Sequence, residues 1–113
     1  MADHIKIRKT SGTFVVRTSG AIVAETSNAM ELSEGDYPAV IYFPRSDVAM
    51  AVLEKTDHST HCPHKGEASY FALVTPEGRI ENAAWSYEDP TEAAKEIAGY
   101  LAFYGDKVTV EQI

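Results

Sequence analysis

The sequence predicts one mainly β domain of the α+β class, in which antiparallel strands are followed by a single C-terminal helix packed outside. Short runs of β-branched and aromatic residues, separated by glycine- and proline-containing turns, fill the first two thirds of the 113 residues. Helical spacing of apolar residues is found only near the C-terminus. The length suits a single domain over residues 1–113, and a hydrophobic fraction of 44% excludes disorder as the main state.

The first predicted hairpin joins residues 13–18 (TFVVRT) to residues 21–26 (AIVAET) through Ser19-Gly20. A third apolar run, residues 39–43, lies between two prolines and suits a strand that is buried on both faces. Ser46 can then cap a short helical turn that begins at residue 47 and ends near residue 54, and an irregular turn is the alternative.

A second hairpin is predicted from residues 67–75 and 79–86, with Pro76-Glu77-Gly78 as the turn. Large side chains point to both faces of its first arm, so we expect both faces to be covered. Residues 108–110 can add one last short strand.

The predicted helix spans residues 90–104. Asp89 is a suitable N-cap, Pro90 a suitable first helical residue, and Glu92 a reciprocal capping partner. Gly105 follows as a stop signal. The apolar face would consist of Ala94, Ile97, Ala98, Leu101 and Tyr104.

The net charge of −7 and a pI near 5.0 exclude general binding to nucleic acid, which needs a clustered excess of Lys and Arg. The first 17 residues are the exception, with four cations (Lys6, Arg8, Lys9 and Arg17) against Asp3. We interpret this basic segment as a solvated sheet edge.

No apolar run is long enough to span a bilayer and no signal peptide is evident, so we expect no membrane partner and a cytoplasmic protein. The single cysteine, Cys62, cannot form an internal disulfide, which fits a reducing compartment.

Residues 57–70 (DHSTHCPHKGEASY) hold the densest group of polar side chains, in a predicted loop between rigid elements. Zinc or iron would suit imidazole and thiolate ligands here, but no second cysteine accompanies them, and exposed loop histidines are the alternative. We therefore assign no metal site. The four candidate ligands are His58, His61, Cys62 and His64.

Cys62 can also be interpreted as a nucleophile, with an imidazole as base and Lys65 lowering the pKa of its thiol, or as a small buried apolar residue. Asp47 is either a turn residue or a catalytic acid, for which Glu34 is the candidate partner carboxylate. Tyr42, Tyr70 and Trp85 either belong to the core or line a pocket for a flat ligand.

Four runs of residues carry a family resemblance. They are Tyr42-Phe43-Pro44-x-x-Asp47-Val48, Thr60-x-Cys62-Pro63-x-Lys65-Gly66-x-Ala68-x-Tyr70, Ala84-Trp85-x-Tyr87-x-x-Pro90 and Gly99-Tyr100-x-Ala102-Phe103-Tyr104. With them the chain resembles, from about residue 20 to 110, the bacterial family catalogued as domain of unknown function 427. That family has a nucleotidyltransferase-type label. The resemblance implies a compact β-tent or Mss4-like fold, whose members often hold zinc between paired CxxC knuckles. This chain departs from that pattern because it has one cysteine.

These observations together predict a small cytoplasmic domain that binds an anionic or aromatic molecule in a cleft near residues 60–66. Alternatives are a nucleotidyltransferase-like or Cys62-dependent enzyme and a homodimeric partner-binding module. Neither a paired-carboxylate magnesium motif nor a glycine-rich phosphate loop accompanies the first of these, and no cofactor is predicted. The site residues carried over from the family motifs are Cys62 and Asp47 as candidate catalytic groups, and Tyr42, Thr60, Lys65, Tyr70, Trp85 and Tyr87 as candidate ligand-binding groups.

Overall fold

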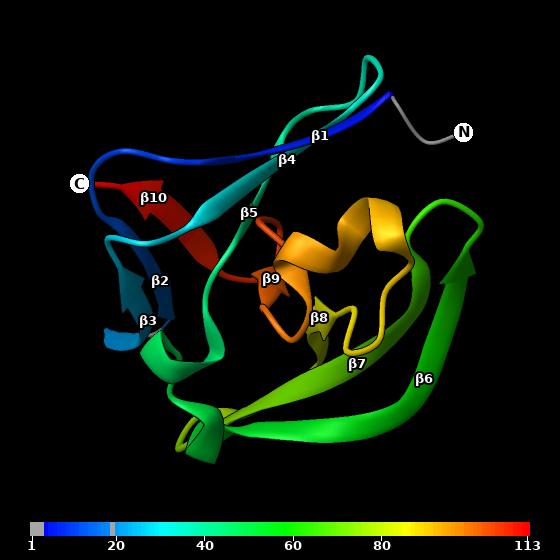
Figure 1. Cartoon of the computed structure of the whole chain (residues 1–113). Helices are drawn as coiled ribbons and strands as arrows, with labels where there is room; N and C mark the ends of the chain where they lie inside the picture. The colour runs from blue at the N-terminus through cyan, green and yellow to red at the C-terminus, as the bar shows by residue number, and fades with distance from the viewer. Residues whose placement is uncertain (1–3, 19) are drawn as a thin grey trace.

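The computed structural model describes residues 4–18 and 20–113, and this part of the chain forms three antiparallel sheets (Figure 1). The mainly β class predicted from the sequence is confirmed. No helix in these two ranges is long and apolar enough to cross a membrane. The strands are β1 (Ile5–Lys9), β2 (Phe14–Thr18), β3 (Ala21–Thr26), β4 (Met30–Glu34), β5 (Val40–Tyr42), β6 (Leu53–Cys62), β7 (Gly66–Thr75), β8 (Gly78–Ser86), β9 (Ala102–Phe103) and β10 (Thr109–Gln112).

The sheets have the strand orders β1-β4-β5, β10-β2-β3 and β6-β7-β8-β9. The first and third sheets meet where Phe43 and Leu101 exchange two backbone hydrogen bonds, of 2.8 and 2.9 Å. A second isolated bridge, from Ala24 to Val48, ties the second sheet to the segment after β5. Strand β5 therefore lies beside β9, and β5, β9, β8 and β7 form one continuous strip.

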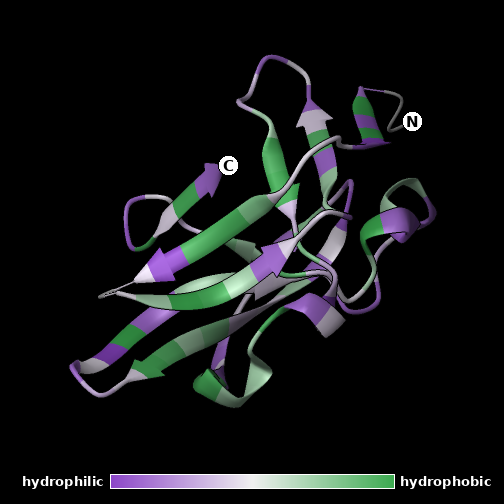
Figure 2. Cartoon of the chain, turned by 90° about the vertical axis from the view of Figure 1, so that its left-hand side faces the viewer, coloured by the Kyte–Doolittle hydropathy of each residue, from purple (hydrophilic) through white to green (hydrophobic). Residues whose placement is uncertain are grey.

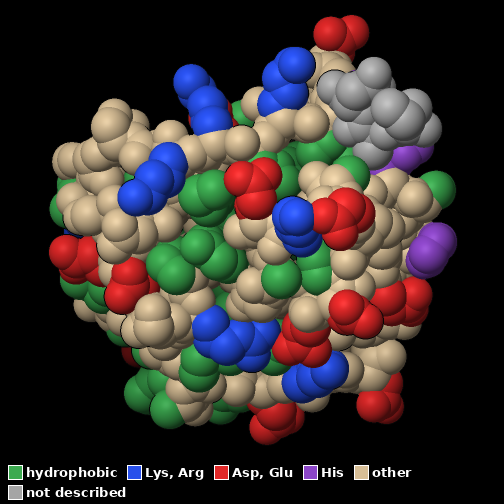
Figure 3. Space-filling model, in the orientation of Figure 1, with side chains coloured by type: hydrophobic (Ala, Val, Ile, Leu, Met, Phe, Trp, Pro, Cys, Tyr) green, Lys and Arg blue, Asp and Glu red, His purple; other side chains and the backbone are tan. Residues whose placement is uncertain are grey.

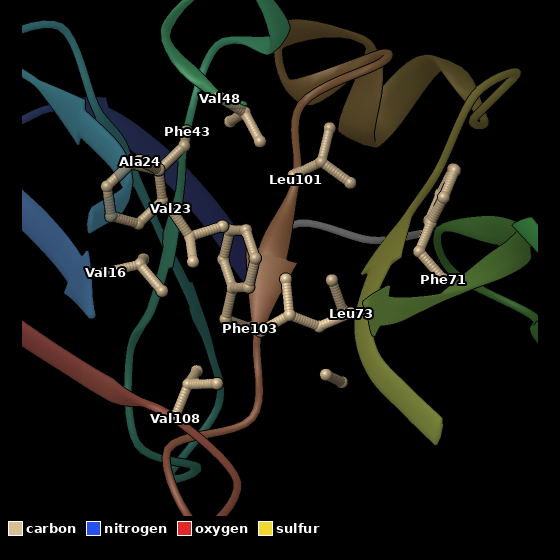
Figure 4. Packing of buried hydrophobic residues seen from close by; sticks show 12 residues of the cluster. Val16, Val23, Ala24, Phe43, Val48, Phe71, Leu73, Leu101, Phe103 and Val108 are labelled. Carbon is tan, nitrogen blue, oxygen red and sulfur yellow. The ribbon is translucent and has the colours of Figure 1, made fainter. Parts of the chain in front are cut away.

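This strip has two faces because successive side chains of a strand point to opposite sides. One face packs into the main core, where the rings of Phe43 and Phe103 meet edge to face at 5.8 Å (Figure 4). The other face belongs to a second buried cluster, which is rich in tyrosine. Residues on the first face include Phe43, Phe71, Ala84 and Phe103, and residues on the second include Tyr42, Tyr70, Trp85 and Ala102.

Both predicted hairpins are confirmed. Strands β2 and β3 pair antiparallel, although Ser19 of their turn lies outside the described residues. Strands β7 and β8 pair across Pro76 and Glu77, and most of β7 is buried. Figure 2 shows continuous hydrophobic stretches on some strands and a mixture of hydrophilic and hydrophobic residues along others.

The prediction of a sheet edge for the basic N-terminal segment holds for β1 but not for Arg17, which lies on β2, the middle strand of its sheet. Strand β1 is the outer strand of its sheet, and Lys6, Arg8 and Lys9 are exposed. Figure 3 shows Lys and Arg side chains along the top of the molecule, where β1 runs. The predicted last strand is also present, as β10 paired with β2.

The predicted helix over residues 90–104 is wrong. A short 3-10 segment, η3 (Glu92–Ile97), is followed by Gly99 at φ +77 and then by β9. Thr91 rather than Asp89 precedes the first turn. The chain leaves the helical path because β9 pairs with β8 and lies beside β5, and these contacts replace helical hydrogen bonds.

Two further expectations need correction. Instead of one helical turn over residues 47–54, two 3-10 turns occur, η1 (Arg45–Asp47) and η2 (Met50–Val52). The segment expected as a loop over residues 57–65 belongs mostly to strand β6, which pairs with β7 up to Cys62. The sequence does not predict strand β6, because β6 lies at the edge of its sheet and few of its side chains are withdrawn from solvent, so no apolar alternation marks it.

Candidate functional site

A pocket of about 220 Å³ opens on the tyrosine-rich face of the strip, between the first and third sheets. The charged residues of its lining are Glu34, at the end of β4, and Lys65, in the turn between β6 and β7. Strand β4 and the loop between β4 and β5 also contribute lining residues. The aromatic lining residues are Tyr37, Tyr42, Tyr70, Trp85, Tyr87 and Tyr104, and the apolar ones are Leu32, Pro38 and Val40.

Strand register sets the aromatic wall. Trp85 pairs with Tyr70 on one side and with Ala102 on the other. The small Ala102 side chain leaves room on β9 for Trp85 Nε1 to donate a hydrogen bond of 3.2 Å to the Tyr42 hydroxyl. The Trp85 ring also stacks, tilted, on Tyr104 with 4.5 Å between centroids. The wall is therefore held by backbone pairing and by contacts among its own rings.

Lys65 is held by the tight turn that ends β6. Its backbone N–H donates to the carbonyl of Cys62 at 3.2 Å, and its carbonyl accepts from the N–H of Thr91 at 3.0 Å. The Thr91 hydroxyl donates to the carbonyl of His64 at 2.7 Å, so the start of η3 is fastened to this turn. The segment that the sequence predicted to cap a long helix instead positions a lysine.

The Lys65 side chain is only 11% exposed and ends in an ion pair. Its Nζ lies 2.5 Å from Glu34 Oε1 and 5.8 Å from the centroid of the Tyr87 ring. The other oxygen of Glu34 lies 3.5 Å from His4 Nε2. Glu34 and Lys65 thus join the first and third sheets across the pocket.

The pair keeps its charges over a wide pH range. The hydrogen bond from Lys65 lowers the pKa of Glu34, against the opposing effect of burial. Burial lowers the pKa of Lys65, but the Glu34 carboxylate more than offsets this, so the pKa of Lys65 is raised. Burial also raises the pKa values of Tyr42, Tyr87 and Tyr104, and their hydroxyls therefore stay protonated at neutral pH.

Gly66 makes the Lys65 turn possible. It adopts φ +109, and a Cβ at this position would lie 3.4 Å from the Cα of Pro90. We predict that Gly66→Ala lowers the free energy of unfolding by about 1–3 kcal/mol, because alanine is strained at this positive φ. Urea denaturation measures the loss. Gly105→Ala is the control, since Gly105 does not adopt a positive φ and a Cβ there meets nothing within 4 Å. An equal loss in both variants would contradict a special role for the backbone conformation of Gly66.

The structure brings five of the predicted site residues together in the pocket lining. Thr60 stands just behind them, with its hydroxyl 2.9 Å from the Tyr70 hydroxyl. Cys62 is half-buried at the end of β6 and packs against the same cluster without lining the pocket. Asp47 lies elsewhere, where its carboxylate accepts a 2.7 Å hydrogen bond from Thr26, and Glu34 is not its partner. The five lining residues are Tyr42, Lys65, Tyr70, Trp85 and Tyr87.

The histidines of the dense polar segment point to separate partners. The His58 ring lies 4.4 Å from that of Tyr70, and His64 lies edge-on to His4 at 4.5 Å. His61 Nδ1 lies 3.4 Å from Glu67 Oε1. Across residues 4–18 and 20–113, no three His, Cys, Asp or Glu side chains are grouped so that they could hold a metal ion.

The sequence did not predict the other six lining residues in these roles. They are Glu34 as the partner of Lys65, the aromatic Tyr37 and Tyr104, and the apolar Leu32, Pro38 and Val40. The helical spacing of residues 90–104 places Tyr104 on a helix face, and this interpretation does not predict its contact with Trp85. Glu34 and Tyr37 flank the turn Gly35-Asp36, and an aromatic residue next to such a turn was the available signal.

The comparison with known protein families agrees with this arrangement of motifs. No curated protein matches the chain. The family model described as "Domain of unknown function (DUF427)" matches residues 6–113, which include every residue of the pocket lining. The resemblance carried by the four sequence motifs is thereby confirmed, and the chain belongs to the DUF427 family.

Proposed function

We propose that the pocket binds a small planar aromatic molecule that carries an anionic group. The observation that carries this proposal is Lys65, the one cation of the described pocket lining, which is buried beside the Tyr87 ring. A buried ammonium group is costly unless it is paired, and Glu34 alone pairs with it among the described contacts. A ligand anion can share or take over that position.

Hydrogen-bond donors for an anion are available in the pocket. A lysine ammonium group has three donors, and its contact with Glu34 uses one of them. The Tyr42 hydroxyl accepts from Trp85, so its own hydrogen remains to be donated. Because burial keeps Tyr42 and Tyr87 protonated, their hydroxyls offer hydrogen-bond donors and add no negative charge.

The remaining lining favours a ring. Aromatic side chains supply large, rigid contact surfaces, and Trp85 already contacts both Tyr42 and Tyr104. The volume of about 220 Å³ lies below the range of roughly 300–1,000 Å³ of pockets for drug-sized ligands. It therefore suits a ligand with one ring. The strand layers that enclose this cleft also support a β-tent-like arrangement, which we propose as the finer description of the fold.

Trp85 is the only tryptophan of the chain, so its fluorescence reports on this pocket alone. We expect 4-nitrobenzoate and 4-nitrophenyl phosphate to quench it in a saturable titration, and the neutral 4-nitrobenzamide to bind more weakly. Lys65→Met is expected to weaken binding of the two anions about 10- to 100-fold, because hydrogen bonds to charged groups are the stronger ones. Binding of the neutral probe should change little.

The matched control is Lys95→Ala, because Lys95 is exposed and pairs only with Glu92 outside the pocket. This variant should bind all three probes like the wild type. Equal binding of the anions by the wild type and Lys65→Met would contradict the proposal. A parallel thermal-shift screen tests the alternatives. A rise in melting temperature only with a nucleoside triphosphate and Mg²⁺ would favour nucleotidyl transfer. No rise with any ligand, together with a dimer in size-exclusion chromatography, would favour a partner-binding module.

A further inference from the structure

Tyr37 is the one aromatic residue of the described lining whose ring stands largely in water. Its exposed fraction is 77%, whereas Tyr42, Tyr70 and Tyr87 are each at most 8% exposed. Yet Tyr37 borders the same pocket. An exposed aromatic ring at a pocket rim gains favourable free energy if a ligand covers it, because apolar surface is then removed from water.

The backbone that carries Tyr37 is fixed. The Tyr37 N–H donates to the carbonyl of Glu34 at 3.0 Å, and the Gly35 N–H donates to the carbonyl of His4 at 3.1 Å. Gly35 adopts φ +53, which closes the turn. The ring therefore projects from an anchored turn at the pocket rim.

The same turn begins with the residue that holds Lys65. The Glu34 carboxylate contacts Lys65 Nζ, and three residues later the chain presents the Tyr37 ring. The anion-binding position and the exposed ring are thus separated by one hydrogen-bonded turn. A ligand that places its anionic group at Lys65 brings its attached ring toward this rim.

We infer that Tyr37 is a specificity-determining residue, which packs on the outer face of the ligand ring and selects flat aromatic anions over saturated ones. This inference rests on the proposed function of the pocket. The inner face of the ring would meet the aromatic wall that contains Trp85, and Tyr37 would complete a two-sided site. A saturated ring is thicker and lacks the π-face that favours stacked and edge-to-face contacts.

The test compares Tyr37→Ala and Tyr37→Phe by quenching of Trp85 with 4-nitrobenzoate. We expect Tyr37→Ala to bind about tenfold more weakly and Tyr37→Phe to bind within about twofold of the wild type, because the ring and not the hydroxyl makes the contact. The dissociation rate should account for most of the loss. Since Tyr37 is exposed, the melting temperature of both variants should match that of the wild type.

Selectivity is measured by displacing 4-nitrobenzoate with benzoate or with cyclohexanecarboxylate. The wild type should prefer benzoate, and Tyr37→Ala should lose most of that preference. Ile22→Ala is the matched control, since Ile22 is also an exposed hydrophobic residue but lies on β3, outside the lining of this pocket.

The possible failures are distinct. Saturable quenching that is equal in the wild type and Tyr37→Ala, with the same selectivity, would overturn the role of Tyr37 and leave the proposed pocket function standing. Absence of quenching by every anionic probe in the wild type would overturn both.

Nitration by tetranitromethane, measured by mass spectrometry, tests whether the ligand covers the Tyr37 ring. We expect saturating 4-nitrobenzoate to protect Tyr37 from nitration. Unchanged reactivity of Tyr37 would count against the contact.

Discussion

Phe43→Ala is expected to lower the free energy of unfolding by about 3–5 kcal/mol, which is a large part of the roughly 5–15 kcal/mol available to a domain of this kind. The Phe43 side chain is fully buried and packs edge to face on Phe103. Its backbone also makes the bridge to Leu101 that joins the first and third sheets. Removing the ring leaves a cavity at the junction on which the pocket depends.

Urea denaturation followed by the fluorescence of Trp85 measures this loss. Phe43→Leu should lose less, about 1–2 kcal/mol, because most of the buried volume is retained. Ile22→Ala serves as the surface control and should change stability by no more than about 0.5 kcal/mol, since Ile22 is 56% exposed. A loss below about 1 kcal/mol in Phe43→Ala would show that the junction is not part of the cooperative core.

The hairpins could be predicted because their signals are local. Strands β2 and β3, and β7 and β8, have β-branched or aromatic runs flanking a glycine- or proline-containing turn. Strand β6 could not be recognised, because most of its residues are exposed and no apolar alternation marks it. Its partner β7 supplies the pairing, which is a tertiary contact that no short window contains.

The missing C-terminal helix has a specific cause. Residues 94–104 fit an apolar spacing of three and four, but Leu101 and Phe103 also alternate with Ala102 in the period of a strand. Burial on both sides of a strand hides that alternation, since all three residues are buried. The helical turn ends at Ile97, since the following Ala98 has a non-helical ψ of 124, and Gly99 then adopts a positive φ before the strand begins.

The candidate site was predictable where its residues share motifs and unpredictable where they depend on distant strands. Lys65, Tyr70 and Trp85 were predicted because they belong to the motifs that carry the family resemblance, and all three line the pocket. The pairing of Lys65 with Glu34 needs β4 to face the β6–β7 turn, although 31 residues separate the two in sequence. The position of the Glu34 carboxylate beside Lys65 therefore depends on how the sheets assemble, and no local sequence pattern predicts it.

The second large effect is expected from breaking this pair. Glu34→Gln should lower the free energy of unfolding by about 2 kcal/mol at neutral pH. This loss lies between the loss of stability on breaking an exposed ion pair and the larger loss on breaking a fully buried one. The Lys65 and Glu34 side chains are 11% and 20% exposed, so desolvation is substantial but incomplete. The loss arises mainly because the buried ammonium group of Lys65 is left without its counter-charge.

The double variant Glu34→Gln/Lys65→Met separates the pair from the two positions. Because it removes both charges, it should recover at least half of the stability lost in Glu34→Gln alone. Lys95→Ala, which breaks an exposed pair with Glu92, should leave stability nearly unchanged. Simple addition of the two single losses in the double variant would contradict a direct coupling between Glu34 and Lys65.

The pH dependence of the Glu34→Gln effect follows from the directions of the pKa shifts. The pKa of Glu34 is lowered from its ordinary value of 4.5, so its contribution is complete above about pH 4.5 and disappears as the pH falls through the folded-state pKa. The pKa of Lys65 is raised from 10.5, so its contribution is complete below about pH 10.5 and disappears as the pH rises through the folded-state pKa.

Unfolding measured from pH 3 to pH 9 should therefore show a constant difference between the wild type and Glu34→Gln at neutral pH, with the two curves converging in acid. Convergence is expected because a protonated Glu34 resembles glutamine in charge, so wild-type Lys65 then loses its counter-charge as well.

The affinity of Lys65 for an anionic ligand should increase in acid, whereas the stability of the wild type decreases. A protonated Glu34 no longer competes for the ammonium group, so 4-nitrophenyl phosphate, which keeps a negative charge in mild acid, should bind more tightly there if the fold persists. Binding that weakens in parallel with stability would instead mean that Glu34 itself contacts the ligand.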